Sequence, residues 1–246
     1  MNRRSFIVRT GTMLGAGAIV GGMPFPSSAA DFSDTRAQSG LSDWDAVRAQ
    51  FNLAPNKINM SCYWHASHPK AVREAIEQHR RGLDECPSEY FQENAPRLEV
   101  AVRSAASEYL DAGPDEFAMT ESTSQGLGTI YNGLKLRPDQ EILSTEQEHI
   151  VTKNALRFRA ERMGTPVRTI SLYENSATVT EDELVDTLIR AVSPRTRIVA
   201  ITWLQSVTGV KMPVRRISQE LSRINANRTE EDQALLCVDG VHGLGV

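Results

Sequence analysis

Few of the residues that hold together disulfide-rich or metal-bound folds occur in this sequence. Its 246 residues include three cysteines, Cys62, Cys86 and Cys237, and no two of them form a CxxC pair. An odd number of widely spaced cysteines predicts neither a disulfide framework nor a zinc site. His65 and His68 have a spacing that metal ligands can have, but no third ligand of matching character lies nearby. We therefore interpret them as loop histidines and expect no metal site.

The chain also lacks an excess of positive charge. Its formal net charge is −4 and it has no stripe of lysine and arginine, which argues against a nucleic-acid-binding protein. The P-loop motif GxxxxGK[ST] is absent, and no GxGxxG follows a strand-like run, so no nucleotide-binding motif is present. Hydrophobic residues make up 40% and charged residues 24% of the chain, as in ordinary globular domains.

The first thirty residues have the layout of an export signal. Arg3 and Arg4 precede an aromatic and an aliphatic residue, a glycine-rich apolar run covers 11–22, and Ser28-Ala29-Ala30 follows. This order of charged region, apolar region and small-residue cleavage site is typical of a signal peptide, and the apolar run is too short to span a bilayer well. We predict a twin-arginine signal over 1–30, export to a bacterial periplasm and no membrane association afterwards. An N-terminal arm over 31–68 and a large domain over 69–246 would follow.

Beyond residue 115, short apolar runs alternate with helical periods. Strand-like runs are 116–119, 141–144, 167–172, 197–204 and 234–238, and helical stripes separate them. Two earlier helices are expected, one short helix within 41–51 and one that Pro69 opens, and a third ends near Gly113. Several strand-like runs are apolar on both faces, which is typical of parallel strands buried between helices. The sequence therefore predicts an α/β fold with a mostly parallel sheet.

Polar residues follow the first two strand-like runs at the places where helices begin. Thr123 and Ser124 lie in the segment Thr120–Gly126, whose hydroxyls and free helix-start N–H groups suit an anion such as phosphate. Plain helix capping by one hydroxyl is the alternative. His149 follows the next strand, where its ring would stack on a flat ligand or cap the following helix.

Polar residues also follow the last two strand-like runs. Ser206 comes after the most continuous apolar run, either as a ligand contact or as part of a glycine-containing turn. Asp239 and His242 come after the run 234–238, at the edge where open α/β sheets bind ligands. Asp239 before a glycine is equally able to start a turn.

In this order, the four loops resemble the class V aminotransferase family of fold-type I pyridoxal-phosphate enzymes, which includes isopenicillin-N-epimerase-like and cysteine-desulfurase-like proteins. The most specific segments are TESTSQGL at 120–127, TEQEH at 145–149, QSVTGV at 205–210 and VDGVH at 238–242. The resemblance implies a three-layer large domain with a mostly parallel sheet, and pyridoxal 5'-phosphate as cofactor.

The resemblance also implies a role for each loop residue. Thr123 and Ser124 would hold the cofactor phosphate, and His149 would stack on the pyridine ring. Asp239 would pair with the ring nitrogen and keep it protonated, so that the ring withdraws electrons from the substrate. His242 and Ser206 would lie near the phenolic oxygen of the ring, and Ser206 stands where some relatives have asparagine.

The family's Schiff-base lysine is expected beyond the VDGVH segment, after another strand, so we expect a C-terminally truncated chain, inactive by itself. The small C-terminal domain is then missing too. The lysines at 57, 70, 135, 153 and 211 do not match the expected position. The implied function is a homodimeric enzyme that transaminates, epimerises or eliminates from an amino-acid substrate. A non-catalytic protein that binds pyridoxal phosphate or another phosphorylated ligand is the alternative, and a domain without cofactor is a third possibility.

Overall fold

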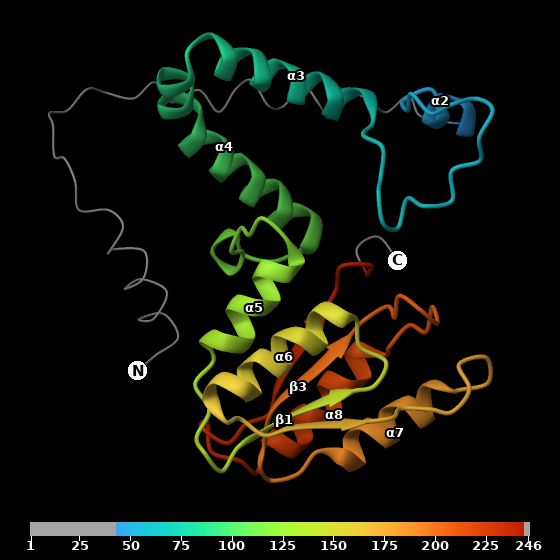
Figure 1. The fold of residues 1–246 in the computed structure, drawn as a ribbon, viewed down its shortest axis with the longest axis vertical. Helices are drawn as coiled ribbons and strands as arrows, with labels where there is room; N and C mark the ends of the chain where they lie inside the picture. The colour runs from blue at the N-terminus through green and yellow to red at the C-terminus, as the bar shows by residue number, and fades with distance from the viewer. Residues whose placement is uncertain (1–42, 244–246) are drawn as a thin grey trace, which may run out of the picture. The chain divides into compact units, whose positions relative to one another are not determined.

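The computed structural model describes residues 43–243, so the predicted export signal lies outside the described residues. The chain divides into two compact units, one up to Arg81 and one from Gly82 (Figure 1). The first unit holds α2 (Trp44–Arg48) and most of α3 (Lys70–Glu85). The Arg73 guanidinium donates to the carbonyl of Gln50 at 2.8 Å and so ties α3 to the segment after α2.

The second unit begins with α4 (Pro87–Leu110) and the short 3₁₀ turn η2 (Pro114–Glu116). The predicted strand over 116–119 is wrong, because 117–120 has no regular structure. The backbone N–H of Gly113 donates to the Glu116 carboxylate at 2.7 Å, which fixes a turn at the point where the strand was expected. Met119 is 59% exposed, so the apolar pattern there does not mark a buried strand.

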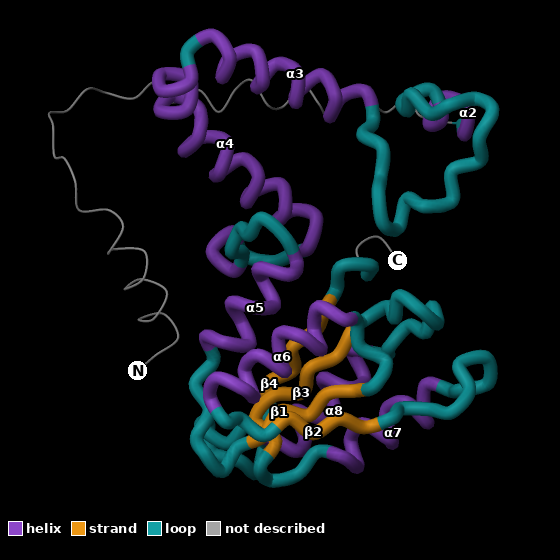
Figure 2. The backbone as a smooth tube through the Cα atoms, in the orientation of Figure 1, coloured by secondary structure: helices purple, strands orange, loops and turns teal. Residues whose placement is uncertain are grey.

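A four-stranded sheet forms the centre of the second unit (Figure 2). Its strands are β1 (Glu141–Thr145), β2 (Val167–Ile170), β3 (Thr196–Thr202) and β4 (Leu235–Asp239). They lie in the order β2-β1-β3-β4 and every pair is parallel, which confirms the predicted α/β fold with a parallel sheet. Because all four strands run the same way, their C-terminal ends meet at one edge.

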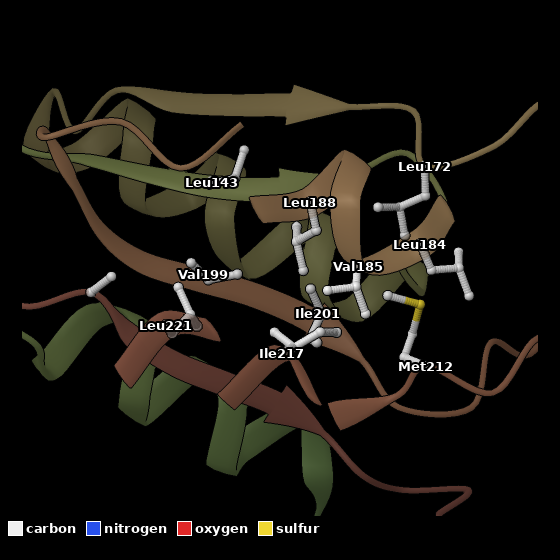
Figure 3. Packing of buried hydrophobic residues seen from close by; sticks show 11 residues of the cluster. Leu143, Leu172, Leu184, Val185, Leu188, Val199, Ile201, Met212, Ile217 and Leu221 are labelled. Carbon is white, nitrogen blue, oxygen red and sulfur yellow. The ribbon is translucent and has the colours of Figure 1, made fainter. Parts of the chain in front are cut away.

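Helices cover both faces of this sheet, since alternate residues of each strand point to opposite sides. Leu143, Val199 and Ile201 pack with α7 (Glu181–Ala191) and α8 (Val214–Asn225) in a continuous apolar cluster (Figure 3). On the other face, Ile142 and Ile198 pack with residues of α5 (Thr123–Gly133) and α6 (Ile150–Met163). Of the predicted ligand contacts, Thr123 and Ser124 are the first two residues of α5, and His149 directly precedes α6.

Local sequence signals set several of these helix ends. The Thr180 hydroxyl accepts from the backbone N–H of Glu183 at 3.2 Å and so caps the start of α7. Pro213 is the cap residue that directly precedes α8. Within 43–243, none of the helices has the combination of length and apolar character that crossing a membrane demands.

Candidate functional site

The C-terminal edge of the sheet brings together residues from two strands and from the start of a helix. Asp239 is the last residue of β4, and its register partner Thr202 is the last residue of β3. The hydroxyl of Thr152, in the first turn of α6, donates to the Asp239 carboxylate over a long 3.4 Å contact. The segment that carries His149, between β1 and α6, is therefore held at the same edge as Asp239.

Asp239 is a buried carboxylate, with only 2% of the residue exposed. Its second oxygen accepts from the backbone N–H of Val241 at 3.2 Å, so it also starts the turn that the sequence allowed. Within the described part of the chain, no lysine or arginine forms an ion pair with it. A buried carboxylate without a cation is costly, and a cationic ligand group would offset that cost.

A second buried acid, Glu148, lies at this edge and was missed by the sequence analysis. Its two carboxylate oxygens accept hydrogen bonds from the hydroxyls of Thr145 and Thr202, both at 2.6 Å. Burial raises the pKa of Glu148, the two hydroxyl donors lower it, and the charge of nearby Asp239 raises it again. The site thus contains two acids that interact with each other and have no Lys or Arg ion-pair partner within 43–243.

His149 is exposed and is the cap residue of α6. Its Nδ1 accepts from the backbone N–H of Val151 at 3.3 Å, so the structure has the helix cap that was the alternative to ring stacking. The cap does not exclude stacking, because it uses one ring nitrogen and leaves the ring exposed at the sheet edge.

Thr123 and Ser124 are exposed residues in the first turn of α5. Ser122 is the cap residue, and its hydroxyl accepts from the backbone N–H of Gln125 at 3.2 Å. Among the described residues, no group accepts from the backbone N–H of Thr123 or Ser124. The helix start therefore keeps two N–H donors and two hydroxyls, which is a donor set suited to an anion. Among the described residues, no hydrogen bond joins this turn to Asp239 or His149.

The loop after β3 places Gln205 inside and Ser206 outside. Ser206 is exposed, whereas Gln205 is 2% exposed. The Oε1 atom of Gln205 accepts from the hydroxyls of Tyr173 and Thr208, and its Nε2 has no hydrogen-bond partner among the described residues. An unpaired buried N–H costs about 1–3 kcal/mol, so Gln205 is a donor available to a ligand.

His242 is half-buried in the turn that follows β4. Gly243 closes this turn, and its backbone N–H donates to the carbonyl of Gly240 at 2.8 Å. A Cβ atom at position 243 would lie 2.0 Å from the Trp203 ring, so only glycine fits there. Trp203, next to the end of β3, therefore fixes the turn that presents His242.

Two further groups lie beneath this edge, the half-buried Cys237 and the buried Tyr131. Burial raises the pKa of the Cys237 thiol to about 11, which disfavours the reactive thiolate. The Tyr131 hydroxyl of α5 has no hydrogen-bond partner among the described residues, and burial is the main cause that raises its pKa. Within 43–243, no three histidine, cysteine or acidic residues gather as a metal site would require.

A model of the family described as aminotransferase class-V matches residues 68–245. An isopenicillin N epimerase of Streptomyces clavuligerus is 23% identical over 205 residues, which cover 83% of this chain and 49% of that protein. A probable cysteine desulfurase of Pseudomonas aeruginosa is 31% identical over 155 residues, 62% of this chain and 37% of that protein. The chain thus spans about half, or less, of the length of these curated relatives.

Solved structures show the same fold. A mutant of C-DES with glycine covalently linked to its PLP cofactor has a TM-score of 0.71 at 24% identity, over 80% of this chain and 50% of that one. The cysteine desulfurase CsdA from Escherichia coli has a TM-score of 0.63 at 23% identity, over 80% of this chain and 48% of that one. The four-stranded parallel sheet with its covering helices is therefore part of the fold of pyridoxal-phosphate enzymes.

Proposed function

Because this chain belongs to the aminotransferase class-V family, we propose that it forms the cofactor-binding domain of a pyridoxal-phosphate enzyme that acts on an amino acid. Family members use pyridoxal phosphate, and relatives of this chain include an epimerase and cysteine desulfurases. Transamination, epimerisation and elimination all begin at the α-carbon of an amino acid, and the proposal covers that shared step. The observation that carries it is the buried Asp239 carboxylate at the end of β4.

The polar groups at this edge fit those of the cofactor. A protonated ring nitrogen needs a carboxylate, and Asp239 has no Lys or Arg ion-pair partner in the described part of the chain. A ring oxygen needs a donor, and the buried Nε2 of Gln205 has no acceptor there. A phosphate needs several N–H and O–H donors, which Thr123 and Ser124 offer at the start of α5.

We infer a separate task for each of these residues. Asp239 holds the proton on the ring nitrogen, and a charge-assisted hydrogen bond of this kind contributes about 1.5–3 kcal/mol. His149 offers a flat face for the ring, with its own orientation fixed by the cap on α6. Ser206 and His242 are proposed neighbours of the ring oxygen, together with Gln205. When bound, the cofactor withdraws electrons from the substrate's α-carbon through its protonated ring.

Titration of the chain with pyridoxal phosphate tests this function. We expect saturable, reversible binding, followed by cofactor absorbance and by quenching of tryptophan fluorescence, because Trp203 lies at this edge. Pyridoxal, which lacks the phosphate, should bind about tenfold more weakly or worse. Binding that never saturates, or that ignores the phosphate, would contradict the proposal.

A non-catalytic cofactor-binding protein is the second candidate. Its support is that the contacts proposed for Asp239, Gln205 and the start of α5 bind the cofactor and need no turnover. Borohydride reduction of the loaded protein, followed by mass spectrometry of its peptides, separates the two. Cofactor fixed on one lysine, with Lys211 beside Trp203 as the first to inspect, supports the enzyme. Binding without any fixed cofactor, and without exchange of the α-proton of an added amino acid, supports the binding protein.

We also propose export and self-association. The twin arginines at 3 and 4 support export to the periplasm, and fusing 1–30 to a reporter that works only outside the cytoplasm tests it. Replacing both arginines by lysine should stop that export. The family likeness supports a homodimer, and sedimentation of the purified chain would show a single monomeric species if that is wrong.

A further inference from the structure

Glu148 joins the ends of two neighbouring strands. Thr145 ends β1 and Thr202 ends β3, and each donates its hydroxyl to a different oxygen of the Glu148 carboxylate at 2.6 Å. All three residues are at least 95% buried. Two short hydrogen bonds shielded from water hold the three side chains in one arrangement.

One of the two strands leads directly to Asp239. Thr202 and Asp239 are register partners in the β3–β4 ladder, and the backbone N–H of Trp203 donates to the Asp239 carbonyl at 2.8 Å. If Glu148 moved relative to Thr202, it would therefore also move relative to Asp239.

The segment after Glu148 leads to the other side of the site. His149 is the next residue and caps α6, whose Thr152 donates to the Asp239 carboxylate. Glu146, two residues before Glu148, has an exposed side chain. Of these two acids, Glu148 is therefore the one that connects the strand ends.

We propose that Glu148 is a positioning residue of the cofactor site, which through the hydroxyls of Thr145 and Thr202 sets His149 and Asp239 at their working separation. The proposal rests on the proposed function, since it assigns the two positioned residues to one cofactor ring. Glu148 itself need not touch the cofactor, because both of its oxygens are occupied by hydroxyl donors.

Matched substitutions test this role through cofactor affinity. Thr202→Val removes the hydroxyl and keeps the shape, whereas Thr202→Ser keeps the hydroxyl. Glu148→Asp shortens the buried acid by one methylene, and Glu146→Asp makes the same change at the exposed acid. We expect Thr202→Val and Glu148→Asp to weaken pyridoxal-phosphate binding by about tenfold, and the other two to stay within about twofold of the wild type.

The visible circular dichroism of the bound cofactor provides a second readout, because it reports the surroundings of the ring and not the stability of the fold. It should change in Thr202→Val and return to the wild-type form in Thr202→Ser. Wild-type affinity in both Thr202→Val and Glu148→Asp would overturn the proposal. So would equal weakening by Thr202→Val and Thr202→Ser, since the hydroxyl would then be irrelevant.

Amide hydrogen exchange of the cofactor-free protein separates this proposal from the proposed function. If the wild type does not bind pyridoxal phosphate, the proposed function fails, while the connection between strands is still measured. Exchange across 146–151 should be faster in Thr202→Val and Glu148→Asp than in Glu146→Asp. Unchanged exchange in both variants would overturn the positioning role.

Discussion

Each edge of the sheet buries one acid near β1, and the two acids differ in their partners. Glu141, at the N-terminal edge, accepts from Arg168 at 2.9 Å, from Ser193 at 2.8 Å and from Thr196 at 2.9 Å. Glu148, at the C-terminal edge, has two hydroxyl donors and no Lys or Arg ion-pair partner within 43–243.

This difference appears in the pKa values. Burial by itself would raise the pKa of Glu141, but hydrogen bonds from Arg168, Ser193 and Thr196 outweigh it and lower the pKa to about 2. Burial raises the pKa of Glu148, and the charge of Asp239 adds to the rise. The N-terminal edge neutralises its own charge, whereas the C-terminal edge leaves negative charge for a ligand to neutralise. Such an imbalance is typical of functional sites.

The largest effect should come from breaking the neutralised edge. Arg168→Met leaves Glu141 buried without its cation, and we expect the free energy of unfolding to fall by about 3–4 kcal/mol, measured by urea denaturation at neutral pH. Arg157→Met removes an exposed pair with Glu161 and should cost less than about 1 kcal/mol. Similar losses in both variants would show that the Glu141 pair is no more important than a surface one.

Low pH should weaken the same edge without a mutation, because it protonates Glu141. The pKa of Glu141 is lower in the folded protein than its ordinary 4.5, so its stabilisation is complete above that value and is lost as the pH falls towards about 2. The loss should amount to about 2–3 kcal/mol in urea titrations. Glu141→Gln should lack this part of the pH dependence, and an unchanged acid slope in that variant would contradict the assignment.

At the other edge, Asp239→Asn tests the charge that is left for a ligand. The amide cannot hold a proton on a ring nitrogen as a carboxylate does, so the dissociation constant for pyridoxal phosphate should rise about 10- to 100-fold, or roughly 2 kcal/mol. The apo protein should not be destabilised, because a buried charge is removed. Asp186→Asn, at an exposed position on α7, is the control and should bind like the wild type.

The sequence was sufficient to predict the parallel sheet and the edge at which Asp239 lies, because an apolar run that ends in an acid is a local pattern. It did not identify Glu148. Glu146 and Glu148 occur in one short polar segment, and which of them is buried depends on Thr202, a residue 54 positions further along the chain. The only local hint is that Thr145 ends an apolar run three residues before Glu148.

For the same reason, the sequence analysis did not single out Gln205. Ser206 and Gln205 are adjacent polar residues beyond the end of β3, where strand alternation no longer indicates which one faces inward. The loop from Gln205 to Val210 determines which of the two is buried, because the backbone N–H of Gln205 donates to the Val210 carbonyl at 3.0 Å and closes it. The strand predicted at 116–119 was wrong because a strand forms only by pairing with a neighbouring strand. The local sequence does not show whether such a partner is present.

The smallest expected effect is on the free energy of unfolding, which should change in opposite directions when the buried acid of each edge is replaced by glutamine. Glu148→Gln keeps one acceptor oxygen and removes the buried charge, so we expect the free energy of unfolding at neutral pH to rise by about 1 kcal/mol. Glu141→Gln should lower it, because there the charge has a cation to pair with. The Glu148 carboxyl has a raised folded pKa, so its charge opposes folding only as the pH rises through that value. The gain in Glu148→Gln should therefore disappear at acid pH, and equal losses in both variants would mean that the two edges do not differ in how they treat charge.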